Sequence, residues 1–106
     1  MQPAKQARLE AAGWRVGSAA EFLGLTPAEA ALVEMKLALA GHLRSLRTRN
    51  AWTQADVAER LGSSQSRVAK MEAADRSVSL DLLVKALLAL GASPADVGRV
   101  IARSAA

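Results

Sequence analysis

The sequence of 106 residues contains no cysteine and no tyrosine, a single histidine, and only 3% aromatic residues. Without cysteine the chain cannot form a disulfide, a zinc-thiolate site or a cysteine nucleophile, and one histidine excludes a metal site built from several histidines. Apolar residues still make up 51% of the chain. Most of them are alanine and leucine, which favour helices over sheets.

Long hydrophobic runs are also missing. The longest, Ala86 to Ala92, is far too short to span a bilayer. The N-terminal region carries Lys5, Arg8 and Glu10 and does not resemble a secretory signal. We therefore expect a cytoplasmic protein with no membrane partner. The length suits one domain, and we expect a head over residues 1–16 followed by a single helical domain over 17–106.

The net charge is +4, and it is unevenly distributed. Residues 1–40 carry 4 basic and 4 acidic groups, whereas residues 41–78 carry 7 basic and 4 acidic groups. A basic excess alone indicates nucleic-acid binding only weakly, but its position coincides with the motif described below.

Helix start signals and apolar spacing predict an all-helical chain. Thr26-Pro27-Ala28-Glu29 combines a capping hydroxyl, a proline in the first turn and an acid that faces the helix dipole. An apolar stripe with spacings of 3 and 4 follows it and predicts a long helix over residues 27–49. The stripe consists of Leu32, Met35, Leu39, Leu43 and Leu46. Further helices are predicted over residues 19–23, 53–61, 64–73, 80–90 and 94–103, and no strand is expected.

Residues 53–73 have the spacing of a helix-turn-helix. Ala58 is small where the two helices would cross at close range. Gly62 allows the turn, because a positive φ costs little only without a Cβ. Val68 supplies an apolar anchor for the second helix, and Ser64 caps its first N–H groups.

Polar residues gather at the start of that second helix, where such a motif enters the major groove. Gln65 has the geometry to read adenine and Arg67 to read guanine, with Ser66 and Lys70 on the same helix. Gln54 begins the first helix, where its amide and the nearby N–H groups can hold a phosphate. The predicted DNA-binding residues are Gln54, Ser64, Gln65, Ser66, Arg67 and Lys70.

The pattern Thr-Gln-x-x-Val-Ala over residues 53–58, with Gly62, Ser64-Gln65, Val68 and Glu72, resembles the Cro/repressor-like (XRE) family of DNA-binding domains. The likeness covers roughly residues 43–93. It implies an all-α fold, a compact five- to six-helix bundle of lambda-repressor-like type with a long N-terminal helix. It also implies that Arg47 and Glu72 form a structural pair. The chain departs from the family pattern at Ser63, Ala69 and Ala74.

Residues 17–29, running into the long helix and residues 43–47, resemble HigA-type antitoxins more narrowly. That likeness implies a homodimer that represses its own operon at a palindromic operator and binds a small basic RNase-type toxin. Trp14 and Phe22 are candidate packing or toxin-contact residues in this leader. We expect the apolar residues of the helix over 80–90 in the core, but they provide more apolar surface than one helix face can bury. These residues are Leu82, Leu83, Val84, Leu87, Leu88 and Leu90. The excess, together with Val97, Val100 and Ile101, suggests a dimer seam.

Other functions fit the sequence less well. A stand-alone XRE-type transcriptional regulator would share the motif without a toxin. A protein-interaction module with weak DNA binding would explain the departures at Ser63, Ala69 and Ala74. An enzyme would need a nucleophile and base, a metal set or a glycine-rich phosphate loop. Because the sequence offers none of these, we expect no catalytic residue, metal or cofactor.

Overall fold

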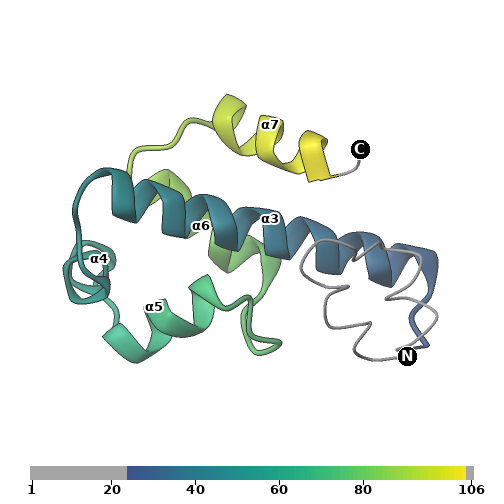
Figure 1. Ribbon diagram of the computed structural model, residues 1–106, viewed down its shortest axis with the longest axis horizontal. Coiled ribbons are helices and arrows are strands. Elements are labelled where there is room, and N and C mark those ends of the chain that lie inside the picture. The colour runs from purple at the N-terminus through teal and green to yellow at the C-terminus, as the bar shows by residue number, and fades with distance from the viewer. Residues whose placement is uncertain (1–23, 105–106) are drawn as a thin grey trace, which may run out of the picture. The chain divides into compact units, whose positions relative to one another are not determined.

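The computed structural model describes residues 24–104, and every regular element in that range is a helix (Figure 1). The chain divides into two compact units, Met1–Glu34 and Met35–Ala106. The predicted head, the helix predicted over residues 19–23, Trp14 and Phe22 lie outside the described residues. The helices are α3 (Pro27–Arg49), α4 (Gln54–Leu61), α5 (Gln65–Glu72), α6 (Leu80–Ala89) and α7 (Pro94–Ser104). They confirm the predicted all-α class.

Helices α3 and α5 begin at the capping side chains that the sequence predicts, Thr26 and Ser64. At the start of α3, Glu29 N donates to Thr26 Oγ1 at 3.1 Å, and Thr26 N donates to Glu29 Oε1 at 2.8 Å. The same reciprocal bonds join Ser93 and Asp96 at the start of α7. Such capping boxes satisfy N–H groups that a helix leaves without partners, so the helix boundaries follow from local chemistry.

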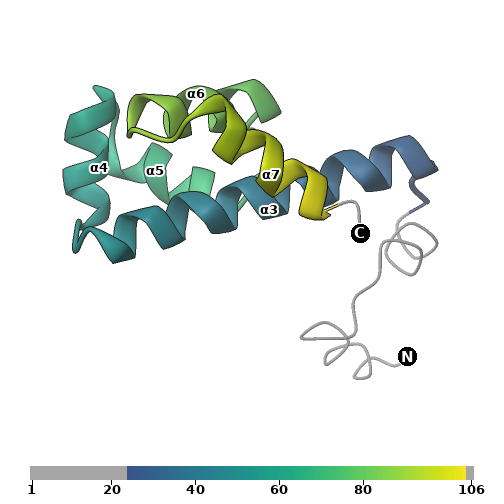
Figure 2. The same cartoon turned by 90° about the horizontal axis from the view of Figure 1, so that it is seen from above.

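The main core of the second unit lies where α3, α6 and α7 meet. Leu39 and Leu43 of α3 and Leu83 and Leu87 of α6 are fully buried. Met71 reaches the same core from α5. Helix α7 lies on one side of α3 and crosses it obliquely (Figure 1, Figure 2). Full burial of a leucine is worth about 1.5–3 kcal/mol, so these contacts supply much of the unit's stability.

A second, smaller cluster joins α4 to α5. Val57 and Ala58 of α4 pack against Val68 of α5, and all three are buried. Leu61 and Leu90 are partly buried against both clusters, so they link the helix pair to the main core. The orientation of α5 is therefore fixed by packing on one side of the helix.

The apolar residues of α6 lie in or against the core, as the sequence predicts, and the chain itself covers most of the excess that suggested a dimer seam. Leu83, Leu87, Val97 and Val100 are buried. Four more of the apolar residues behind that suggestion pack partly buried against the core, namely Leu82, Val84, Leu90 and Ile101. Only Leu88 among them is exposed, at 41%. Residues of α3 and α7 pack against the apolar residues of α6, and the spacing within α6 alone could not indicate this.

Candidate nucleic-acid interface

The turn between α4 and α5 depends on Gly62. Its φ of 65° and ψ of 39° are left-handed, as the sequence predicts. Its N–H donates to the carbonyls of Ala58 and Glu59, and Ser63 N donates to Ala58 O at 2.8 Å. These bonds close the end of α4, so the chain reverses within a few residues and α5 can begin at once.

The crossing of α4 and α5 is close because its central residue is small. Ala58 is 5% exposed and Val68 is completely buried beside it. A larger side chain at residue 58 would force the helices apart, because closely packed cores do not absorb added volume. The crossing therefore presents the outer side of α5 to solvent at a fixed angle.

The N-terminal turn of α5 is polar and open to solvent. Ser64 Oγ accepts a hydrogen bond from Arg67 N at 3.1 Å and caps the helix. Gln65, Ser66, Arg67 and Lys70 are all exposed. The first N–H groups of a helix carry partial positive charge, which adds to the two cationic side chains.

One carboxylate, that of Glu72, joins three helices on the inner side of α5. Arg47 of α3 donates to it twice, from Nε to Oε2 at 2.5 Å and from Nη2 to Oε1 at 3.0 Å. Gln54 of α4 donates from Nε2 to Oε1 at 3.1 Å. Arg47 Nη1 also donates to the carbonyl of Trp52 at 3.2 Å. The end of α5 is thus tied both to α3 and to the start of α4.

The surroundings of Glu72 keep it ionised. Burial raises the pKa of its carboxyl, but the hydrogen bonds from Arg47 and Gln54 and the charge of Arg44 together hold the pKa below its usual value. The hydrogen bond to Glu72 raises the pKa of Arg47 in turn. A charge-assisted, bidentate pair of this kind is stronger than a surface ion pair, and it fixes the relative geometry of its helices.

Gln54 and Arg60 both make contacts that the sequence pattern does not predict. One N–H of the Gln54 side-chain amide donates to Glu72, so its second N–H, its oxygen and the backbone of the first turn of α4 remain for other contacts. The Arg60 guanidinium lies 4.0 Å from the centroid of the Trp52 ring, a cation–π contact. The spacing of residues in the sequence predicts neither contact, because each joins segments that only the folded chain brings together.

Comparison with known proteins agrees with this geometry. A family model described as a helix-turn-helix domain matches residues 38–100, which is more than half of the chain. The chain belongs to the helix-turn-helix domain family. No curated protein and no solved structure matches it. A helix-turn-helix domain is the kind of fold that a DNA-binding regulator uses, and its second helix is the one that enters the major groove.

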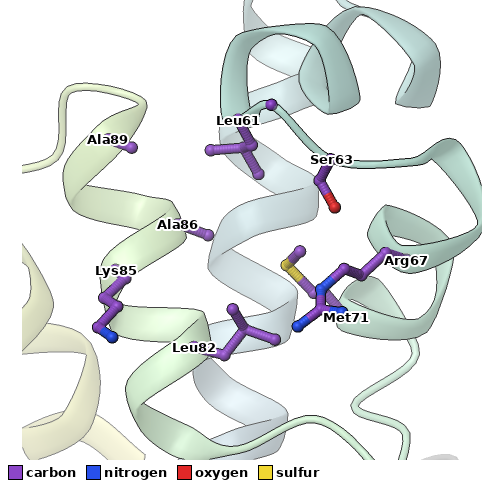
Figure 3. A pocket seen from close by; sticks show the side chains of 9 residues that line it. Leu61, Ser63, Arg67, Met71, Leu82, Lys85, Ala86 and Ala89 are labelled. Atoms are coloured by element: carbon purple, nitrogen blue, oxygen red, sulfur yellow. The ribbon is translucent and has the colours of Figure 1, made fainter.

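The recognition helix of this helix-turn-helix domain borders a groove of about 420 Å³ on its α6 side. Its apolar floor consists of Leu61, Met71, Leu82, Ala86 and Ala89. Arg67 points into it from α5, and Lys85 lines it from α6 with its ammonium group turned away from Arg67 (Figure 3). Gln65, Ser66 and Lys70 are not among the residues that line this groove. Of these four predicted DNA-binding residues, Arg67 is the one that lines the groove.

Two further observations concern metals and membranes. Within residues 24–104, no group of three or more histidine or acidic side chains is arranged to hold a metal ion. None of the helices in that range combines the length and apolar character that crossing a membrane requires.

Proposed function

We propose that this helix-turn-helix protein is a sequence-specific transcriptional repressor that reads double-stranded DNA with the N-terminal turn of α5. One observation carries the proposal. A polar, solvent-exposed turn with Gln65, Ser66 and Lys70 stands on a helix whose other side is anchored by the buried Val68 and Met71. A rigid rod with an exposed polar tip is what readout in the major groove requires.

The polar side chains of the N-terminal turn of α5 suit different contacts with DNA. Gln65 can donate to and accept from the edge of adenine, and Lys70 can donate to guanine or to a phosphate. The N-terminal turn of α4, which Gln54 begins, faces the phosphate backbone through its free N–H groups. The protein acts by binding rather than by catalysis. Because its ligand is DNA, we place it in the cytoplasm.

A homodimer is part of the proposal, because two recognition helices about 34 Å apart match a palindromic operator. Leu88 supports a contact between two copies, since it is exposed on a helix whose other leucines are buried or half-buried. Sedimentation equilibrium with and without operator DNA tests this. The proposal predicts two chains for each operator, and one chain for each operator would contradict it.

The experiment that tests DNA binding is a gel-shift titration against the DNA upstream of the protein's own gene, with an unrelated duplex as competitor. The proposal predicts specific retardation at submicromolar protein, because specific sites bind with dissociation constants of about 10⁻⁸ M or tighter at physiological salt. Equal binding of both duplexes, or no retardation at micromolar protein, would contradict it and favour the interaction-module alternative.

We further propose that this repressor is the antitoxin of a toxin-antitoxin pair. The HigA-type pattern over residues 17–29 supports this, and so do three exposed apolar side chains on α3, those of Leu32, Val33 and Leu37. Exposed apolar side chains are suited to a protein partner. Co-expression with a small basic protein encoded next to this gene tests it. Co-purification and relief of growth arrest, both weakened by Leu37→Ser, are expected, whereas two proteins that purify separately would favour the stand-alone regulator.

A further inference from the structure

Gln65 and Arg67, both in the N-terminal turn of α5, do not point in the same direction. Successive residues of a helix are turned by about 100°, so Gln65 and Arg67 lie about 160° apart around the axis of α5. By the same geometry Arg67 lies about 40° from Met71, which is buried. Figure 3 shows Arg67 reaching into the groove between α5 and α6. Lys70 lies about 140° from Gln65 and about 60° from Arg67. If the arc from Gln65 through Ser66 to Lys70 faces the base edges, Arg67 lies beyond the edge of that arc, toward a wall of the major groove.

The groove that Arg67 enters is lined by positive charge, which attracts the phosphates of a DNA strand. Its described lining contains two cations, Arg67 and Lys85, and no acidic residue. Lys85 is available, because its Nζ lies 3.8 Å from Asp81 Oδ2 and both side chains are about three-quarters exposed, at 76% and 74%. Such a surface pair contributes little and yields to a stronger anion.

The proposed phosphate contact at the start of α4 lies on the other side of α5. Glu72, on that side, holds Gln54 at the start of α4. The groove with Arg67 and Lys85 lies between α5 and α6, on the α6 side. A helix in the major groove lies between two phosphate strands, so one strand would run past α4 and the other past α6.

We infer that Arg67 and Lys85 together contact the DNA phosphates of the strand on the α6 side, and that Arg67 is a phosphate contact rather than a reader of guanine. The inference rests on the proposed DNA binding. It assigns a DNA contact to α6, and it leaves base readout to Gln65, Ser66 and Lys70. Phosphate contacts fix the register of a protein on DNA but carry no sequence information directly.

Salt dependence and base preference separate the two roles of Arg67. Binding of Arg67→Ala and Lys85→Ala is measured by fluorescence anisotropy, with a selected site and an unrelated duplex, between 50 and 200 mM salt. Each variant should reduce the salt slope by about 1. Between 50 and 200 mM salt, the loss of affinity of the wild type should therefore be about 3.5 times that of the variant. The ratio of specific to non-specific affinity should change little, and Arg67→Lys should retain most of the slope.

Arg103→Ala is the matched control, because Arg103 is an exposed cation on α7 and does not line this groove. Its salt slope should equal that of the wild type. Circular dichroism should show all four variants folded, since each replaced side chain is exposed. Lys85→Glu extends the test, and it should weaken binding to both duplexes more than Lys85→Ala does.

Two results would overturn the inference while leaving the proposed function intact. One is a relaxed preference at a single base pair in Arg67→Ala, which would make Arg67 a base reader. The other is an unchanged salt slope in Lys85→Ala, which would leave the groove to a protein partner. A wild-type protein that binds neither duplex would instead contradict the proposed function, and the phosphate contact with it.

Discussion

The side-chain amide of Gln54 donates a hydrogen bond of 3.1 Å to Glu72, so the first residue of α4 is tied to the last residue of α5. Arg47 of α3 donates to the same carboxylate oxygen at 3.0 Å. The two helices of the motif are therefore held to each other, and to α3, at the end of α5 that lies away from its exposed tip. The orientation of that tip depends on this one carboxylate as well as on the small cluster around Ala58.

Gln54→Ala should lower both stability and DNA affinity. Loss of the hydrogen bond to Glu72 should cost about 1 kcal/mol of unfolding free energy. Affinity should fall by a similar factor for specific and unrelated duplexes, because a phosphate contact carries no sequence information directly. Urea denaturation and anisotropy titrations measure the two effects. Glu59→Ala, an exposed position on the same helix, is the control. A changed base preference in Gln54→Ala would contradict this assignment.

Arg47→Ala should be among the most destabilising single changes in the chain. It leaves Glu72, whose side chain is 6% exposed, without its charged partner. Breaking a fully buried pair costs about 3–5 kcal/mol, so this partly buried pair should cost about 2–3 kcal/mol. Arg49→Ala removes the same charge from an exposed position two residues later and should change stability by less than about 0.5 kcal/mol. Chemical denaturation of both variants gives the comparison, and equal effects would show that the pair has no structural role.

Stability should fall on acidification. The pKa of Glu72 is held below its usual value, so its contribution is complete above the unfolded pKa of about 4.3 and is lost as the pH falls through the lower folded pKa. The lowered pKa values of Asp56 and Asp96 in their capping boxes act in the same direction. Glu72→Gln should be less stable than the wild type at pH 7, and the difference should narrow below about pH 4. Thermal unfolding between pH 2 and 7 measures it, and a wild-type protein that gains stability on acidification would contradict it.

The helices could be predicted because their ends are determined locally. Thr26 and Ser64 each accept a hydrogen bond from a backbone N–H three residues later, and Gly62 supplies the left-handed residue between α4 and α5. All of these interactions join residues close in sequence, so the residue types and their spacing were sufficient. The inward direction of Val68 and Met71 followed from the same helical period.

The directions of the polar side chains at the site could not be predicted in the same way. Whether Gln54 faces a phosphate or Glu72 depends on the position of α5, and Arg67 faces a groove that exists only because α6 packs nearby. The apolar surplus on α6 illustrates the same limit. Spacing within one helix shows how much apolar surface it carries, but not how much of that surface α3 and α7 cover.

Ala74→Gly should stabilise the protein. Ala74 has a φ of 51°, in the left-handed region, where the XRE-like pattern has glycine. An alanine there carries a steric cost of about 1–2 kcal/mol, and the greater unfolded-state freedom of glycine offsets part of the gain. We expect a net increase of about 0.5–1 kcal/mol, measured by urea denaturation. The neighbouring Ala73, at a φ of −88°, is the control, because Ala73→Gly should bring no gain. A less stable Ala74→Gly would show that the methyl group matters more than the strain.

The most direct test of the central claim is selection of binding sites from a pool of random duplexes at physiological salt, with the wild type and Gln65→Ala in parallel. The wild type should select a defined, palindromic sequence. Gln65→Ala should bind that sequence on the order of 1–3 kcal/mol more weakly and should tolerate any base at one position of each half-site. If Gln65→Ala selects the same sequence with the same affinity as the wild type, the tip of α5 does not read DNA.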